Sequence, residues 1–236
     1  ADIRKYSAHT VRNYNIDLMQ FIVYLYKCDK ELLILDVHKE NIQEYMFSLY
    51  AKKKSDKTIA RKVATLKSLF SYMAKQNIID SNILSVIKIP KVSKKLPHLL
   101  SKDEIKRLFS IDLSDNKILM EMCILELFYA TGMRISELAQ IRISNIDFEG
   151  KTIKVLGKGC KERIVILSSN SIIVLKQYIN IFCNKGQMFL FGSLIKNRKI
   201  SHHMSERSIY NITKKHLKRI SNDEKLTPHS LRHSFA

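Results

Sequence analysis

Residues 89–99 contain Pro90 and Pro97, two of the three prolines of this chain of 236 residues. Proline fixes φ and has no backbone N–H, so a helix cannot continue through this stretch. We therefore expect an extended linker at 89–99 between an N-terminal domain, residues 1–88, and a second domain, residues 100–236. The linker is also strongly basic, because four lysines lie in it or directly before it: Lys88, Lys91, Lys94 and Lys95.

Apolar residues recur at helical spacing in three stretches before the linker. These stretches cover residues 7–27, 39–52 and 56–76, and a shorter helix is expected at 81–87. The pattern predicts a small four-helix bundle. Three basic residues of the third stretch lie outside its apolar positions and are expected on the surface: Arg61, Lys62 and Lys67.

The second domain is expected to be mainly helical, and it begins with a capping box, Ser-Lys-Asp-Glu at 101–104. Residues 152–156 and 163–167 are rich in β-branched side chains and flank a Gly-Lys-Gly turn, which predicts a β-hairpin. A further short strand is expected at 188–191. The expected fold class is therefore mainly α with a small β-hairpin or sheet (α+β), with helices at 102–110, 116–131, 135–141, 169–183 and 205–221.

The net charge of the chain is +19. Such an excess of positive charge points to a polyanionic partner, most often nucleic acid. A protein made basic by an AT-rich genome is the alternative. The four cysteines lack the Cys-x-x-Cys spacing of zinc sites, and no carboxylate cluster suggests a two-metal nuclease, so no metal site is expected. No cofactor is expected either. The N-terminus is polar and no apolar run approaches 18 residues, so we expect a cytoplasmic protein outside the membrane.

The first candidate site motif is Thr-Gly-Met-Arg-Ile-Ser-Glu-Leu at 131–138. Gly132 can end a helix in the left-handed conformation, which would aim Arg134 rather than leave it in solvent. The planar guanidinium suits bidentate binding of a phosphate. Glu137 could reach back and hold a basic group in place. Taken alone, the motif also fits a helix-capping arginine with a surface glutamate.

The second motif is the hairpin turn at 157–163, which carries Lys158, Lys161 and Arg163. A flexible basic tip can enter a DNA groove or contact phosphates. A lysine there could also protonate a departing oxygen. The alternative is a solvated turn with ordinary charges.

The third motif is Thr-Pro-His-Ser-Leu-Arg-His at 227–233. Thr227 and Pro228 are typical of an N-cap and first helical position. His229 and Arg232 are three residues apart and would share one face of the helix. His233 is expected to pack or to form hydrogen bonds in a supporting role. A capped surface helix is the alternative.

Together, the three motifs resemble those of the tyrosine recombinases, and most closely the Xer-like integrases and recombinases of bacteria and archaea. The resemblance implies an N-terminal core-binding helical domain and a catalytic domain that clamp duplex DNA. It implies that Arg134 and Arg232 bind the scissile phosphate, that Lys158 acts as general acid, and that His229 and Glu137 complete the site. Such enzymes cut and rejoin DNA through a 3′-phosphotyrosyl intermediate without metal or ATP.

The family's nucleophilic tyrosine has no counterpart here, because all ten tyrosines precede His229 and the last is Tyr210. We therefore expect a C-terminally truncated chain that binds paired half-sites but does not cleave them. The resemblance implies a homotetramer or heterotetramer for the whole protein on two DNA sites and a monomer for this fragment off DNA. The resemblance leaves two biological roles open: chromosome partition in the cell cycle and integration of mobile elements. Residues expected to contact DNA are Arg61, Lys62, Lys67, Lys91, Lys94, Lys95, Lys161 and Arg163.

Two other functions stay open at this point. One is a non-catalytic DNA-binding protein that retains the scaffold of the recombinases. The other is a type IB topoisomerase, which uses similar chemistry on a single duplex. Binding to paired half-sites would argue against the topoisomerase.

Overall fold

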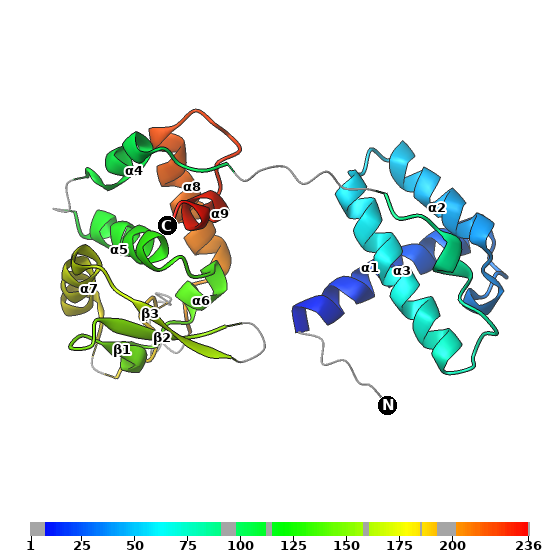
Figure 1. Cartoon of the computed structure of the whole chain (residues 1–236), viewed down its shortest axis with the longest axis horizontal. Coiled ribbons are helices and arrows are strands. Elements are labelled where there is room, and N and C mark those ends of the chain that lie inside the picture. Colours follow the sequence, from blue (N-terminus) through cyan, green and yellow to red (C-terminus); the bar gives the residue numbers. More distant parts are fainter. Residues whose placement is uncertain are drawn as a thin grey trace. The chain divides into compact units, whose positions relative to one another are not determined.

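The computed structural model describes residues 8–90, 98–111, 115–157, 161–184, 186–192 and 202–235. The chain forms two compact units, residues 1–95 and 96–236 (Figure 1). Each unit has its own hydrophobic core. Lys91, Lys94, Lys95 and Lys158, four of the residues expected to act on DNA, lie outside the described residues.

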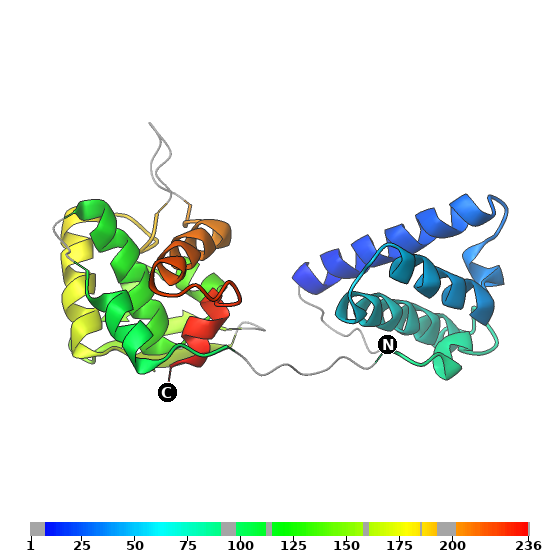
Figure 2. The same cartoon turned by 90° about the horizontal axis from the view of Figure 1, so that it is seen from above.

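The first unit is a bundle of three α-helices that pack against one another (Figure 2). The fourth predicted helix, at 81–87, is a 3-10 helix of four residues, whose Asn82 side chain accepts a hydrogen bond from the N–H of Leu84. Fully buried side chains of all three helices meet in the core, Phe21, Ile42 and Phe70 among them. The elements are α1 (Ala8–Cys28), η1 (Ile34–Asp36), α2 (Lys39–Ala51), α3 (Asp56–Lys75) and η2 (Ile83–Val86).

The second unit is helical with a small antiparallel sheet, so the predicted fold class is confirmed. Its predicted helices are all present, with ends that differ by at most two residues, and the capping box at Ser101 and Glu104 starts the first of them. The elements are α4 (Lys102–Phe109), α5 (Asn116–Thr131), α6 (Ile135–Ala139), η3 (Ile143–Asn145), β1 (Ile146–Asp147), β2 (Thr152–Leu156), β3 (Glu162–Ile166), α7 (Ser169–Phe182), α8 (Glu206–Ile220) and α9 (Pro228–His233).

Helix α5 lies at the centre of the second unit, between α7 on one side and α8 with α9 on the other (Figures 1 and 2). Nine of its 16 residues are buried, which fits a helix that is apolar on most of its circumference. Because α5 and α9 are in contact, the helix that carries Arg232 lies against the helix that precedes Arg134.

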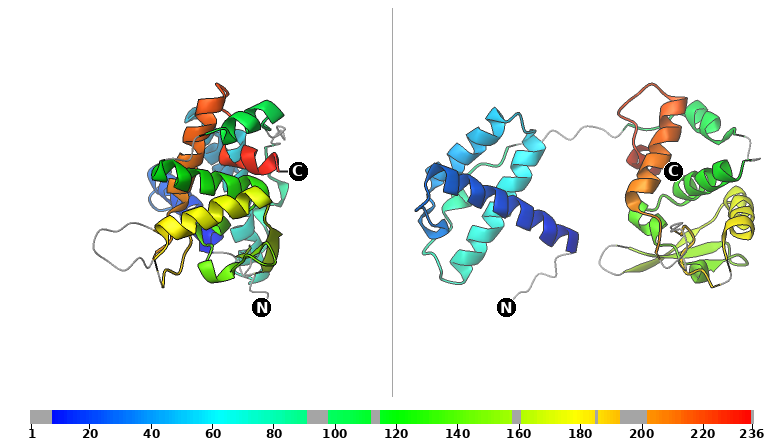
Figure 3. Two further views of the ribbon diagram at one scale, coloured as in Figure 1. Left: turned by 90° about the vertical axis from the view of Figure 1, so that its left-hand side faces the viewer. Right: turned by 180° about the vertical axis from the view of Figure 1, so that it is seen from behind.

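The sheet has the strand order β1-β2-β3 and lies at the opposite end of the unit from α4 (Figure 3). In the β2–β3 hairpin Ile153 pairs with Val165 and Val155 with Arg163, and the N–H of Gly157 donates to the carbonyl of Lys161 over 2.7 Å. Ile153, Val155 and Val165 face the core. The prediction of a strand at 188–191 is wrong, because Phe189 forms only an isolated bridge with Arg142.

Within the part of the chain that the structure describes, no helix is both long enough and apolar enough to cross a membrane.

Candidate active site

The turn between α5 and α6 positions Arg134. Gly132 adopts the left-handed conformation (φ 55°, ψ 24°), and its N–H donates to the carbonyl of Phe128 over 3.1 Å. This confirms the expected helix end at Gly132. The chain then turns so that Arg134 becomes the N-cap of α6, with its guanidinium half exposed.

Glu137 is the buried anion of the site. Its carboxylate accepts hydrogen bonds from the backbone N–H of Arg134 (2.7 Å) and from Nη1 of the same residue (2.8 Å). Burial alone would raise the pKa of Glu137, but hydrogen bonds from Arg163 and Arg134 outweigh it and lower the pKa to about 2. The expectation that Glu137 reaches back to a basic group is confirmed, and the alternative of a surface glutamate is wrong.

Arg163 is the second partner of Glu137. Its Nη1 and Nη2 donate to the two carboxylate oxygens over 2.8 and 2.7 Å, a bidentate pair. The expected place of Arg163 at the hairpin tip is therefore wrong, because the residue lies within β3 and its guanidinium points to Glu137. The sequence contains a signal for this inward orientation of Arg163. Arg163 and Val165 are two residues apart in a strand, so they lie on the same face, and Val165 is apolar.

Helix α9 carries the third motif, and its predicted N-cap Thr227 and first-turn Pro228 are confirmed. Arg232 is partly buried, and its Nη1 is buried without a hydrogen-bond partner in the described part of the chain. Burial lowers the pKa of Arg232, and the positive charges of Arg134 and Arg163 lower it further. Three guanidinium groups and one carboxylate therefore interact electrostatically in one place.

The two histidines of the third motif differ from Arg232 in their surroundings. His229 and His233 are both exposed, and neither imidazole ring forms a hydrogen bond with another described residue. The packing or hydrogen bonding expected of His233 is therefore not observed.

The segment after α9 fixes the helix to its surroundings. The ring of Phe235 packs against Gly132, two residues before Arg134. The hydroxyl of Ser234 accepts a hydrogen bond from the N–H of Leu100 over 2.8 Å. These contacts bring the arginine of α9 to the arginine of the α5–α6 turn, although 98 positions separate them.

The base of the hairpin also reaches this place. A Cβ built on Gly157 would lie 3.2 Å from Nη1 of Arg163 and 3.6 Å from Oε1 of Glu137. Lys158 follows Gly157 directly in the sequence. Lys161 is exposed, as expected of a basic residue at the hairpin turn.

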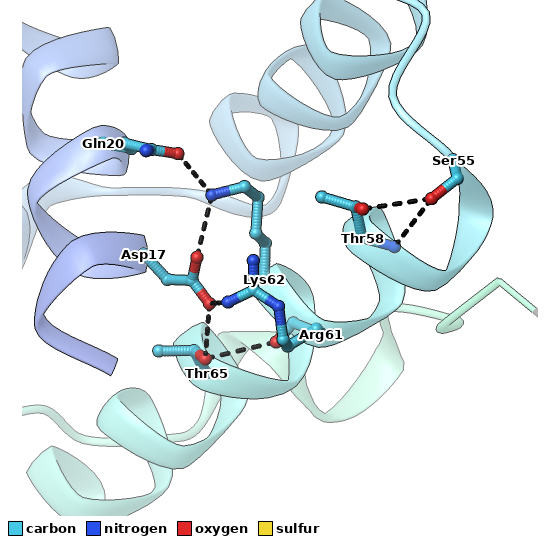
Figure 4. A network of polar contacts seen from close by, with 7 residues as sticks. All are labelled: Asp17, Gln20, Ser55, Thr58, Arg61, Lys62 and Thr65. Atoms are coloured by element: carbon cyan, nitrogen blue, oxygen red, sulfur yellow. Dashed lines mark hydrogen bonds and ion pairs between the residues drawn. The ribbon is translucent and has the colours of Figure 1, made fainter. Parts of the chain in front are cut away.

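The three basic residues predicted for the DNA surface of the first unit differ in burial and partners, and Figure 4 shows two of them, Arg61 and Lys62. The side chain of Lys62 is buried, and its Nζ donates to Asp17 over 2.8 Å and to Gln20. Its expected surface position is therefore wrong, because the buried carboxylate of Asp17 pairs with it. Arg61 is half exposed and also donates to Asp17, whereas Lys67 is partly buried.

Among the described residues, no group of three or more His, Cys, Asp or Glu side chains is arranged to hold a metal ion. The site is instead built from cations that surround one carboxylate. Fold and site together describe a basic protein of two units, with a cluster of arginines around one buried carboxylate in the second unit.

Comparison with known proteins identifies the class more closely. The Phage integrase family matches residues 98–236, and the N-terminal SAM-like domain of phage integrases matches residues 2–77. The chain belongs to the phage integrase family, the family of the tyrosine recombinases.

Relatives of known function extend over nearly the whole chain. A tyrosine recombinase of Pseudothermotoga lettingae is 32% identical over 237 residues, which covers 99% of this chain and 79% of the relative. The tyrosine recombinase XerD of Halalkalibacterium halodurans is 31% identical over 242 residues, which covers 99% of this chain and 78% of the relative. The resemblance drawn from the three motifs is therefore confirmed, and the protein is a DNA-binding recombinase.

Solved structures show the same fold. The XerH site-specific recombinase bound to palindromic difH substrate, a post-cleavage complex, has a TM-score of 0.73 at 25% identity, with 98% of this chain and 69% of that chain covered. A lambda integrase dimer bound to a COC′ core site has a TM-score of 0.72 at 17% identity, with 98% and 80% covered. The likeness to lambda integrase concerns the fold alone.

Proposed function

We propose that this protein cuts and rejoins DNA strands through a 3′-phosphotyrosyl intermediate, with Arg134 and Arg232 bound to the scissile phosphate. The observation that carries the proposal is the buried, unpaired Nη1 of Arg232 beside two further guanidinium groups. A buried donor without a partner is costly, and an anion that accepts from it would remove that cost. A phosphodiester has the charge and the oxygen geometry for this role.

The cluster suits the transition state of phosphoryl transfer better than the ground state. As the nucleophile attacks phosphorus, negative charge spreads over the non-bridging oxygens, where fixed cations stabilise it. Arg134 and Arg232 supply these cations, because Glu137 neutralises only part of the local positive charge. His229, exposed on the same helix as Arg232, is the further donor in this proposal.

The chemical steps need no external energy. A tyrosine hydroxyl loses its proton to solvent as its oxygen attacks the phosphorus, a phosphotyrosyl ester forms at the 3′ end, and the bond to the 5′ oxygen breaks. Lys158 donates the proton that the departing 5′ oxygen takes up. A 5′-hydroxyl of a partner strand then attacks the ester, returns its proton to Lys158, and releases the tyrosine, whose oxygen takes a proton back from solvent. One ester replaces another at each step, so neither ATP nor a metal ion is required.

We propose further that the nucleophile is not among the tyrosines of residues 1–236. Tyr178 is buried and donates to the carbonyl of Leu190, and burial raises its pKa. Tyr129 packs on the ring of Phe109, and Tyr210 lies below the guanidinium of Arg207. The partners of these three rings, Leu190, Phe109 and Arg207, all lie outside the arginine cluster. Residues 1–236 are thus expected to bind paired half-sites without cleaving them, and the tetramer implied by the family resemblance stays part of this proposal.

A suicide substrate tests both parts. A duplex is first selected from random-sequence DNA by binding to residues 1–236 and is called here the selected duplex. It is then nicked at successive positions, so that any cleavage releases a short fragment and traps the covalent complex. We expect binding without adduct for residues 1–236, and an adduct for a chain extended past Ala236 with the tyrosine-bearing segment of a relative.

The control is the extended chain with Arg232→Ala, which should bind the duplex and form no adduct. An adduct formed by residues 1–236 alone would refute the assignment of the nucleophile. Absence of any adduct from the extended chain would contradict strand transfer and favour a DNA-binding protein without catalysis.

A further inference from the structure

Arg163 differs from the other basic residues of the hairpin in what its side chain touches. Its guanidinium makes two parallel hydrogen bonds to Glu137, whose side chain is 3% exposed. Lys154, on the neighbouring strand, instead forms an ion pair of 2.7 Å with Glu162, and both of these side chains are more than half exposed. An exposed pair of this kind contributes little, whereas a bidentate pair with a buried carboxylate fixes geometry.

Glu137 is shared between Arg163 and Arg134. Oε1 accepts from Nη1 of both arginines, and Oε2 accepts from Nη2 of Arg163 and from the backbone N–H of Arg134. The carboxylate is therefore held from two sides, by β3 and by the N-terminus of α6. Without the two hydrogen bonds from Arg163, the carboxylate could turn toward Arg134 and accept hydrogen bonds from that guanidinium with both oxygens.

The base of the hairpin contacts the same pair. A Cβ on Gly157 would lie 3.2 Å from Nη1 of Arg163, which is closer than most real Cβ contacts, so a larger residue would press on the pair. One guanidinium thus lies beside the hairpin base and also binds Glu137, the carboxylate that Arg134 shares.

We infer that Arg163 is a positioning residue: it holds Glu137 from the hairpin side and thereby leaves Arg134 oriented toward the DNA phosphate, without contacting DNA itself. This inference rests on the proposed function, because it takes Arg134 to bind a phosphate. It replaces the role of a hairpin-tip DNA contact that the sequence suggested for Arg163. The functional consequence of Arg163 should therefore appear in how Arg134 engages DNA.

The test compares Arg163→Gln and Arg163→Lys with the matched control Lys154→Gln, all in residues 1–236. Lys154→Gln also removes one cation and one ion pair from the hairpin, on the face that does not contact Glu137. Binding of the selected duplex is measured against salt concentration. If Arg163 contacted a DNA phosphate, the negative slope of log K against log salt would become less steep by about 0.9 in Arg163→Gln, and Arg163→Lys would restore the original slope.

The second readout is the coupling between Arg134 and a single phosphate. Arg134→Ala and methylphosphonate substitution of that phosphate should have non-additive effects on binding in the parent protein. We expect this coupling to be lost in both Arg163→Gln and Arg163→Lys, because lysine cannot reproduce the bidentate fork. It should persist in Lys154→Gln. Circular dichroism reports whether each variant is folded, and Arg163→Lys keeps the test informative if Arg163→Gln does not fold.

The outcomes separate the inference from the proposed function. Lack of coupling in the parent protein would contradict the phosphate-binding role of Arg134 and leave the inference without its basis. Coupling in the parent that persists in Arg163→Lys would overturn the inference. A salt slope that becomes less steep in Arg163→Gln and returns to the parent value in Arg163→Lys would overturn the inference as well, because it would show that Arg163 contacts DNA.

Discussion

The ring of Phe235 lies directly against the Cα of Gly132. A Cβ built on Gly132 would stand 2.7 Å from Cδ1 and 3.1 Å from Cγ of that ring. Only glycine allows this approach, and the left-handed φ of 55° favours glycine as well. The contact joins the motif that contains Arg134 to the segment that follows Arg232.

Gly132→Ala should destabilise the second unit by two separable effects. The left-handed backbone costs about 1–2 kcal/mol for a residue with a Cβ. Displacement of the Phe235 ring adds a cost of about 1–3 kcal/mol. Denaturant unfolding measures the sum. In a Phe235→Ala background the second cost should vanish, so equal effects of Gly132→Ala in both backgrounds would show that the ring contact is unimportant.

Glu137 should make stability depend on pH in acid. Because its pKa in the folded protein is about 2 and its ordinary value is 4.5, its contribution is complete above pH 4.5 and is lost as pH falls toward 2. The contribution is at most about 3 kcal/mol and smaller where water screens the exposed arginines.

Thermal unfolding of the parent and of Glu137→Gln tests this dependence. The parent should be the more stable protein at pH 7, and the difference should shrink between pH 4.5 and 2. Glu149→Gln, which changes an exposed glutamate in a turn, is the control and should show no such trend. A difference that is constant with pH would mean that the ion pairs of Glu137 do not contribute.

Asp17 should matter more to the first unit than Arg61 does. Asp17→Asn leaves the buried amine of Lys62 without an anion, and loss of one partner of a buried pair costs about 3–5 kcal/mol. Arg61→Gln removes a half-exposed partner and should cost about 0–1 kcal/mol. Hydrogen exchange of the α1 and α3 amides reports on this unit separately. Equal losses of protection in both variants would contradict the ranking.

Sequence reasoning predicted the elements of this protein better than the directions of its charged side chains. The helix ends at Gly132 and Thr227 follow from local backbone chemistry, which the sequence displays directly. The burial of Lys62 depends on Asp17, 45 positions away on another helix, and no local pattern reveals that pairing. Arg163 is the intermediate case. Strand alternation indicates its face, although the prediction placed it at the hairpin tip, and Glu137, its partner, could be found only once the hairpin was packed against α6.

The central claim is that Arg134 and Arg232 bind the same phosphate. The most direct measurement replaces each phosphate of the selected duplex in turn by a neutral methylphosphonate and compares binding by the parent, Arg134→Ala and Arg232→Ala. Each arginine substitution should weaken binding of the unmodified duplex by about 10- to 100-fold, as expected for loss of a charge-assisted hydrogen bond. We predict one phosphate position at which neutralisation abolishes the effect of both substitutions. Coupling of the two arginines to different phosphates, or to none, would contradict the account.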